Sequence, residues 1–296
     1  MTMALHIKPS LNDWLIKLSN IEIPAMQYTL DQMAHLKSKS DDISIRDLSQ
    51  LIRHDPLLTL RLIRFQQEHR RAVQTSDVNT VDHVLLMIGM TGFFREFSTM
   101  PAIENTLHQS PSALISIKKI ISRSYLAAKI AESLGGQRHD VDPVEVITAS
   151  LLHDLAEILL WLIAPELAQQ IALHIQRHPG SRSHDAQKLI LGFTNNELQT
   201  ALAQHWHLPA LLTHLMDERH IDEPRVRTVT IATSTARHLV HHWQDPALPD
   251  DYQNIADLLS CDDDHAYALV RNVMIKAAHE WSWFSVLPVA SQIPQQ

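Results

Sequence analysis

Apolar side chains recur every three or four residues along most of this chain, and this spacing limits the fold more than any other feature. One series is Leu48, Leu51, Ile52, Leu58, Leu62 and Phe65, and a second is Ile120, Ile121, Leu126, Ile130 and Leu134. Such spacing places side chains on one face of an α-helix, whereas a half-buried strand alternates apolar and polar residues. Glycine is also scarce, with six in 296 residues, and tight hairpin turns rely on glycine for positive φ angles. The pattern therefore predicts an all-α fold.

Charge and cysteine content narrow the class of protein further. The formal net charge is −8, whereas nucleic-acid-binding proteins usually carry a basic face, so we do not expect a nucleic-acid partner. Cys261 is the only cysteine, which excludes an internal disulfide and a multi-cysteine zinc site. No apolar run reaches the roughly 20 residues that span a bilayer, and residues 1–10 lack the apolar core of a signal peptide. We therefore expect a cytoplasmic protein without membrane insertion.

The most apolar stretch of the chain, residues 145–162, contains three polar side chains: His153, Asp154 and Glu157. A helix that is apolar on most faces is usually buried at the centre of a domain. An adjacent His and Asp in such a helix can both reach one metal ion, but a hydrolytic metal needs about three protein ligands and an open position for water. The two side chains can equally hydrogen-bond to neighbouring helices. The same dipeptide also recurs at His54-Asp55, His139-Asp140 and His184-Asp185.

Histidine is abundant, with 20 copies, and two further clusters could supply metal ligands. One cluster consists of His205, His207, His214 and His220, and the other of His238, His241 and His242. Most histidines on helices are surface residues or hydrogen-bonded core residues, and we interpret both clusters in that way. Trp206 and Pro209 indicate a helix end packed into the core. Cys261 precedes three aspartates whose charges raise the pKa of its thiol, so it is interpreted as a bystander.

Local signals suggest where the chain is divided. The expected parts are an N-terminal helical segment (residues 1–40), a main domain (41–245) and a C-terminal helical tail (246–296). Ser44 and Asp47 form a helix-start signature, Pro143 suits the first turn of another helix, and Gly135-Gly136 is expected to end the preceding helix in left-handed conformation. Loops are expected over residues 66–80, 178–185 and 245–251.

Five segments, taken in chain order, are similar to the motifs of one family. In the first, residues 51–64, the pair Asp55-Pro56 opens a leucine-rich helix. The family usually continues with Asn-Ser, where this chain has Gln66-Gln67. In the second, residues 81–89 end in an Ile-Gly pair, and Phe93 and Phe94 follow.

The other three segments are more specific. Residues 123–128 begin with Arg-Ser, like the family's His-Ser or Arg-Ser helix. Residues 149–157 resemble a Leu-Leu-His-Asp-Ile-Gly-Lys helix, with Ala156 and Glu157 in place of its glycine and lysine. Residues 206–209 resemble a Trp-x-Leu-Pro motif. Because five motifs occur in the correct order over about residues 20–245, the chain resembles the HDOD family.

The resemblance implies a multi-helix bundle related to the metal-dependent HD and HD-GYP phosphohydrolases. Active members of that superfamily hold metal with a first His, the His-Asp doublet and a distal Asp. By position these correspond to Arg123, His153-Asp154 and Thr233, so two of the four ligands are missing. A further histidine is replaced by one of the residues 195–197 (Asn, Asn, Glu). Arg123 would also repel a metal ion. The set is therefore expected to be a vestigial pocket without metal or other cofactor; if a metal is bound, His153 and Asp154 are its ligands.

The resemblance implies a non-catalytic regulatory module of bacterial signal transduction that contacts protein partners. We hypothesise that Arg123 pairs with Asp154 and replaces the metal as the link between helices. Two alternatives stay open. One is a residual HD-type phosphohydrolase acting on a nucleotide or cyclic dinucleotide, with substitute ligands from the histidine-rich C-terminal half. The other is ligand sensing without turnover, in which Arg123 and His153 contact the phosphate of a nucleotide.

Overall fold

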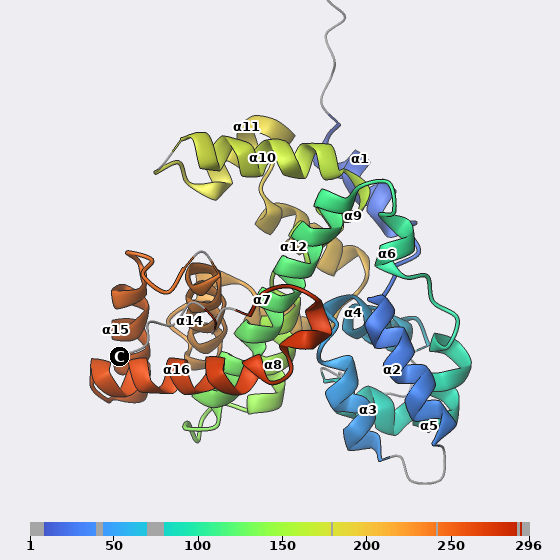
Figure 1. The fold of residues 1–296 in the computed structure, drawn as a ribbon, viewed down its shortest axis with the longest axis horizontal. Coiled ribbons are helices and arrows are strands. Elements are labelled where there is room, and N and C mark those ends of the chain that lie inside the picture. Colours follow the sequence, from blue (N-terminus) through green and yellow to red (C-terminus); the bar gives the residue numbers. More distant parts are fainter. Residues whose placement is uncertain are drawn as a thin grey trace, which may run out of the picture.

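The computed structural model describes residues 9–39, 44–69, 80–178, 180–240, 242–288 and 291 (Figure 1). Within these ranges the regular structure is helical, apart from an isolated parallel bridge between Ala25 and Ala102, and the predicted all-α fold is confirmed. The helices are α1 (Leu11–Ser19), α2 (Gln27–Ser38), α3 (Ile45–Ile52), α4 (Pro56–Glu68), α5 (Val81–Phe97), α6 (Ile103–Thr106), α7 (Pro111–Gly135), α8 (Pro143–Leu152), α9 (Leu155–Ile163), α10 (Pro165–Arg177), α11 (Ser183–Leu191), α12 (Asn195–His205), α13 (Ala210–Leu215), α14 (Pro224–Leu239), α15 (Leu248–Leu259) and α16 (Asp263–Ala278), with 3₁₀ turns η1 (Glu218–His220) and η2 (Trp281–Phe284).

Two clusters of buried apolar side chains organise these helices. The smaller lies among α2 to α5 and includes Phe93 and Phe97; we name this unit the N-terminal lobe. The larger extends through α1 and α7 to α16 and forms the main body. Helix α4 contributes to both, because Leu58 faces the lobe while Leu57 faces the main body. This double contact explains why α4 is apolar on more than one face.

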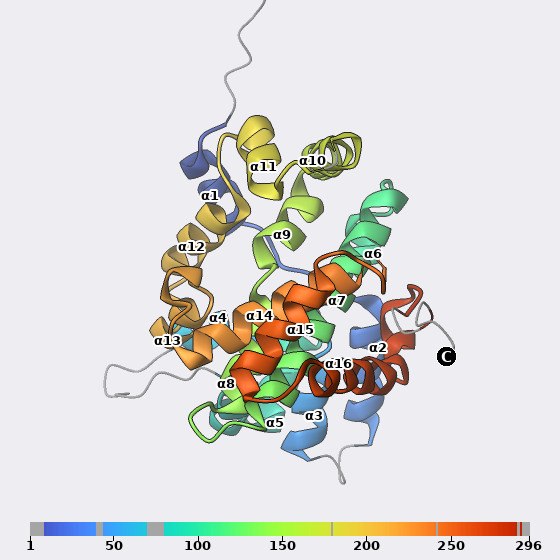
Figure 2. The same ribbon diagram turned by 90° about the vertical axis from the view of Figure 1, so that its left-hand side faces the viewer.

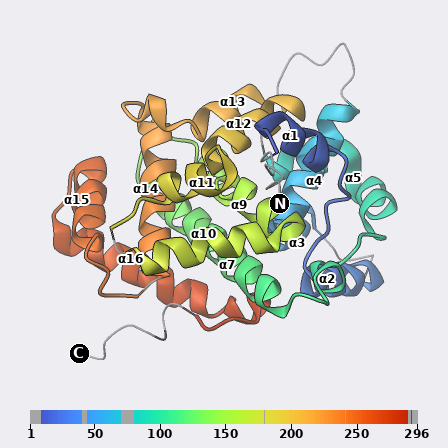
Figure 3. The same cartoon turned by 90° about the horizontal axis from the view of Figure 1, so that it is seen from above.

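Helix α7 is the central element of the main body (Figure 2). Its 25 residues pack chiefly against α8 and α14, and also against α9 and α16. Seen from above, α10 and α11 lie over one end of this arrangement, and α15 and α16 lie at its side (Figure 3). Helix α1 lies outside the N-terminal lobe and packs against α12.

The expected single helix over residues 145–162 is wrong, because the structure ends α8 at Leu152 and begins α9 at Leu155. The joined segment Pro143–Ile163 has the length and composition of a membrane span. However, 83% of its most apolar window is buried inside the protein. Such burial is typical of helices in a protein core. The doublet occupies the turn between the two helices.

Some of the predicted helix boundaries are confirmed and one is wrong. Ser44 and Asp47 form the expected capping box, and Pro143 begins α8. The expected left-handed C-cap at Gly135-Gly136 is wrong, since Gly136 has a φ of −67°. Gly135 is needed for space instead: a Cβ atom there would lie 3.2 Å from both Pro143 Cα and Val146 Cγ2. Helix α7 can therefore approach α8 closely at this point.

The three expected loops are shorter than predicted. Helix α4 continues to Glu68, and residues 70–79 lie outside the described residues. Helix α10 ends at Arg177, directly before the second expected loop, and α11 begins at Ser183, inside it. Helix α15 begins at Leu248, inside the third, because Pro249 suits its first turn.

The C-terminal segment after α16 is fastened to the N-terminal lobe by a polar contact, which we name the clasp. The Nε2 atom of His54 lies 2.7 Å from Glu280 Oε2, and the hydroxyl of Tyr125 donates to the same oxygen. The ring of His54 stacks between Tyr125 and Trp283, with centroid distances of 4.7 and 4.0 Å. The hydrogen bond from His54 lowers the pKa of Glu280 to about 2, against the opposing effect of burial.

We predict that Gly135→Ala lowers the free energy of unfolding by about 1–3 kcal/mol, because overpacking displaces the neighbouring helix. Urea unfolding followed by circular dichroism measures the change. Gly92→Ala is the matched control, because its Cβ would meet only Ile88 Cβ at an ordinary 3.6 Å. Gly92→Ala should leave stability equal or higher. Equal destabilisation by the two variants would contradict the close-approach argument.

A second prediction concerns pH. The pKa of Glu280 is about 2 in the folded protein, below its ordinary value of 4.5, so the ionised carboxylate stabilises the fold. This contribution is present above pH 4.5 and is lost as the pH falls toward about 2. The difference in free energy of unfolding between the wild type and Glu280→Gln should therefore shrink below about pH 4.5. A difference that stays constant down to the acid limit of folding would contradict the prediction.

Candidate functional site

His153 and Asp154 lie where the α8–α9 segment is interrupted, and the carboxamide of Gln199 on α12 makes this interruption. Gln199 Oε1 accepts from the backbone N–H of Ala156 at 2.8 Å, and Gln199 Nε2 donates to the carbonyl of Leu152 at 2.7 Å. In an uninterrupted α-helix those two backbone groups would bond to each other. A side chain that inserts into the ladder in this way kinks a helix.

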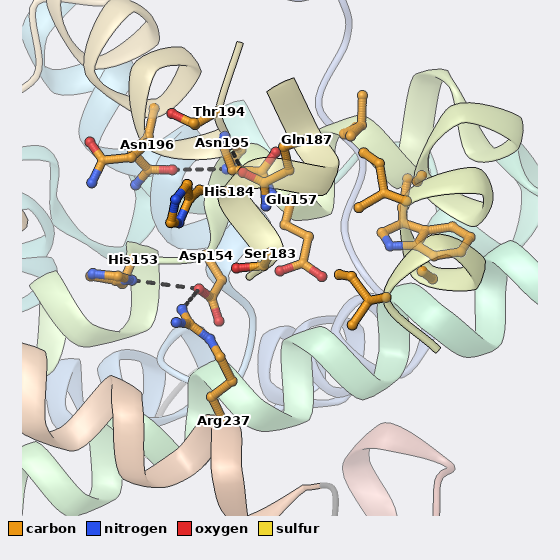
Figure 4. A pocket seen from close by; sticks show the side chains of 18 of the residues that line it. His153, Asp154, Glu157, Ser183, His184, Gln187, Thr194, Asn195, Asn196 and Arg237 are labelled. Carbon is orange, nitrogen blue, oxygen red and sulfur yellow. Dashed lines mark hydrogen bonds and ion pairs between the residues drawn. The ribbon is translucent and has the colours of Figure 1, made fainter. Parts of the chain in front are cut away.

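Asp154 is bound by two arginines from different helices, and Figure 4 shows the contact with one of them, Arg237. The predicted pair with Arg123 is present: Arg123 Nε donates to Asp154 Oδ2 at 2.7 Å. Arg237 on α14 donates to Asp154 Oδ1 at 3.1 Å. Arg123 also donates to Glu157 Oε2 at 2.7 Å. We name these four residues the ion network; it joins α7, α9 and α14.

Electrostatics hold the network in its charged form. Burial opposes ionisation of Asp154, but the charges of Arg123 and Arg237 outweigh it and keep the pKa of this carboxyl well below its ordinary value. Burial likewise opposes the charge on Arg123, and the two carboxylates raise the pKa of its guanidinium above its ordinary value. The side chains of Arg123 and Asp154 are 11% and 9% exposed, whereas that of Arg237 is 41% exposed. Arg237 is therefore the most exposed member, followed by Glu157 at 31%.

The network forms one wall of a cavity of about 790 Å³ between α7, α9, α10, α11, α12 and α14. The cavity is lined by Arg123, His153, Asp154, Glu157, Trp161, His184, Gln187, Asn195, Asn196, Gln199, Glu218 and Arg237, among others. In Figure 4 the amide side chains face the network from the opposite side. The buried Oδ1 atom of Asn195 has no hydrogen-bond partner within the described part of the chain.

The structure brings together three of the four residues of the predicted vestigial pocket. Arg123, His153 and Asp154 line the cavity, whereas Thr233 does not. The buried hydroxyl of Thr233 donates to backbone carbonyls of its own helix. Arg237, one helical turn further along α14, reaches the cavity instead.

The three residues that could replace the family's further histidine, 195–197, lie in the first turn of α12. Asn195 and Asn196 line the cavity, while Glu197 caps the start of α12 through Thr194. Sequence reasoning missed Arg237 and Gln199. The position of Arg237, four residues after Thr233 on one helix face, was the available signal. No local pattern marks Gln199.

Two other histidines, His184 and His238, each lie beside an aspartate. His184 lies at the cavity, 3.0 Å from Asp185. His238 Nδ1 lies 2.6 Å from Asp251 Oδ2, and this carboxylate raises the pKa of the imidazole. His241 lies outside the described residues, so the expected His238–His241–His242 face is not placed.

These residues do not fit a hydrolytic metal ion at the doublet. Such an ion requires free carboxylate and imidazole electron pairs and an open position for water. Both oxygens of Asp154 accept bonds from arginine, and Arg123 brings a permanent cation into the position expected for a ligand. Among the described residues, no group of three or more potential ligands includes His153 or Asp154.

Comparison with protein families gives a match to the HDOD domain over residues 23–221. The chain belongs to the HDOD family. Among solved structures, this HDOD chain is similar to the MmoQ response regulator of Methylococcus capsulatus, at 22% identity and a TM-score of 0.60, covering 84% of this chain and 98% of that one. It is also similar to a virulence factor of Campylobacter jejuni, at 13% identity and a TM-score of 0.65, covering 90% and 99%. These likenesses show a shared fold. A comparison with curated proteins gave no significant match.

The ion network should contribute strongly to stability. We expect Arg123→Ala to lower the free energy of unfolding by about 3–5 kcal/mol, because it leaves two partly or fully buried carboxylates without their main partner. Urea unfolding at neutral pH measures this loss.

The matched control is Lys129→Ala on the same helix, which removes an exposed pair with Glu132 and a cation–π contact with Tyr125 and should cost at most about 1–2 kcal/mol. The double variant Arg123→Ala/Asp154→Ala should lose less than the sum of its single variants. Full stability of Arg123→Ala would show that the network is not a structural link.

Proposed function

We propose that this HDOD protein is a non-catalytic regulatory module of a bacterial signalling pathway. The observation that carries the proposal is the engagement of both Asp154 oxygens by Arg123 and Arg237. A metal-activated water needs that carboxylate as a ligand. Arginine cannot give up its charge to make room for a metal, so the ion network opposes hydrolysis at this position.

The cavity supports ligand sensing as the input of the module. Its volume of about 790 Å³ lies within the range of small-molecule sites. Its walls offer the amides of Gln187 and Asn196 and the aromatic face of Trp161. A nucleotide is the candidate ligand that suits this mixture, since amides bind a base edge and an arginine binds phosphate.

Arg237 is the residue through which such a ligand would act. Its side chain is 41% exposed and holds Asp154 through one bond at 3.1 Å, whereas Arg123 is bound to two carboxylates. A phosphate that recruited Arg237 would compete with Asp154 and thereby change the contact between α14 and α9. That differential contact is what a ligand needs in order to shift a conformational equilibrium. The output would be a contact with a protein partner in the cytoplasm.

The alternative function is residual phosphohydrolysis, and one set of measurements separates it from sensing. We expect tag-free protein to hold no metal that depends on His153 or Asp154, as measured by elemental mass spectrometry of wild type, His153→Ala and Asp154→Ala. We expect no Mn²⁺-dependent hydrolysis of bis(p-nitrophenyl) phosphate or of cyclic dinucleotides. Nucleotide binding without product, weakened in Arg237→Met, is the result that sensing requires.

Stoichiometric metal that disappears with the doublet, together with turnover, would overturn the proposal and favour the phosphohydrolase. Lys188→Met is the control for Arg237→Met, because Lys188 is a cation on α11, one of the helices around the cavity, but does not itself line the cavity. Equal loss of nucleotide binding in both variants would indicate a non-specific charge effect and would contradict recognition by Arg237.

A further inference from the structure

A second cluster of potential ligands lies outside the cavity, where α13, η1 and α14 follow one another. His214 is on α13, His220 ends η1, and Glu223 precedes α14. One ligand atom from each of the three lies within 4.8 Å of the others. Among the residues that the structure describes, this is the one such group of three. None of the three lines the cavity of the ion network.

The internal geometry of this cluster already resembles a ligand set. His214 Nε2 lies 2.8 Å from Glu223 Oε2, and His220 Nδ1 lies 3.8 Å from Glu223 Oε1. The two imidazole rings have their centroids 4.4 Å apart. The hydrogen bond from His214 lowers the pKa of Glu223. The carboxylate is thus ionised at neutral pH and directed toward both imidazoles.

The surrounding charge favours a cation. Residues 217–223 read Asp-Glu-Arg-His-Ile-Asp-Glu, with four carboxylates and one arginine. The charge of Arg219 is matched by Asp217, whose carboxylate it binds at 2.8 Å. Side-chain exposures of 35%, 45% and 53% for His214, His220 and Glu223 leave the cluster open to an ion from solvent.

We propose that His214, His220 and Glu223 form a binding site for a divalent transition-metal ion, with Zn²⁺ as the best match. Two imidazoles and a carboxylate suit Zn²⁺, Ni²⁺ or Co²⁺, whereas Ca²⁺ and Mg²⁺ prefer sets made of oxygen ligands. Water would complete the coordination. Small side-chain rotations replace the existing His214–Glu223 hydrogen bond by two bonds to the metal.

The site would add a metal link among three elements that are joined by packing and by the His214–Glu223 hydrogen bond. A bound ion would link the end of α13, η1 and the start of α14. Glu218, in the same loop, lines the cavity, and its Oε1 lies 3.9 Å from His153 Nε2. Metal binding would therefore fix a loop at the cavity rim. The metal site is independent of the proposed sensing function, because none of its ligands belongs to the ion network.

The test is titration of the tag-free protein with Zn²⁺ alone, using a chromophoric competitor, in wild type, His214→Ala and Glu223→Gln. We expect one ion per chain in wild type. We expect at least about 10- to 100-fold weaker binding in each variant, since even outer-shell changes have effects of this size. Zn²⁺ should also raise the Tm of wild type and not that of the variants. Circular dichroism checks that the variants fold, and Glu223→Gln preserves the size of the side chain.

The chain supplies a matched control in His174 and His178, which stack on α10 with centroids 4.3 Å apart and belong to no three-ligand group among the described residues. His174→Ala/His178→Ala should bind Zn²⁺ like wild type. Loss of binding in this control with retention in His214→Ala and Glu223→Gln would overturn the proposal. A thiolate charge-transfer band on Co²⁺ substitution would also overturn it, because the ion would then be bound by Cys261.

Discussion

The buried ion network is the interaction on which the arrangement around the cavity depends. Arg123, Asp154 and Glu157 are removed from water to different degrees, and transferring charges out of water costs several kcal/mol per ion unless each is paired and hydrogen-bonded. Here each of the two Asp154 oxygens receives a bond from a different arginine. The helices α7, α9 and α14 must therefore keep the spacing at which these bonds form. In HD enzymes a metal ion would impose a comparable constraint; in this chain side chains of opposite charge do so.

Much of this arrangement could be predicted from the sequence, because local and chemical signals coincide. The capping box at Ser44 and the proline that begins α8 act within a few residues, so a single sequence is enough to recognise them. The Arg123–Asp154 pair was predictable since an arginine and an aspartate took places that the family resemblance puts in one pocket. The domain boundaries stay a prediction.

The errors arise where distant residues compete with local propensity. The apolar pattern of residues 145–162 favours one continuous helix, yet Gln199, more than forty residues away, supplies hydrogen bonds that interrupt it. The family resemblance puts Thr233 in the pocket, but its short side chain bonds to its own helix, while the longer Arg237 reaches across from the next turn. The sequence suggests that Gly135 allows a left-handed backbone, whereas the structure shows that the close approach of Pro143 leaves no room for a side chain there. None of these outcomes depends on sequence neighbours alone.

The interruption by Gln199 has a further consequence for how the cavity could change in related chains. In a continuous helix, successive side chains point about 100° apart, whereas the turn between α8 and α9 gives His153 and Asp154 a different relative orientation. The orientation of the doublet is thus set by an amide on another helix. A sequence that replaced Gln199 by an apolar residue would allow the Leu152 carbonyl and the Ala156 amide to bond directly and the two segments to fuse. The same His-Asp pair would then point elsewhere, which means that identity at the doublet is insufficient to infer its geometry.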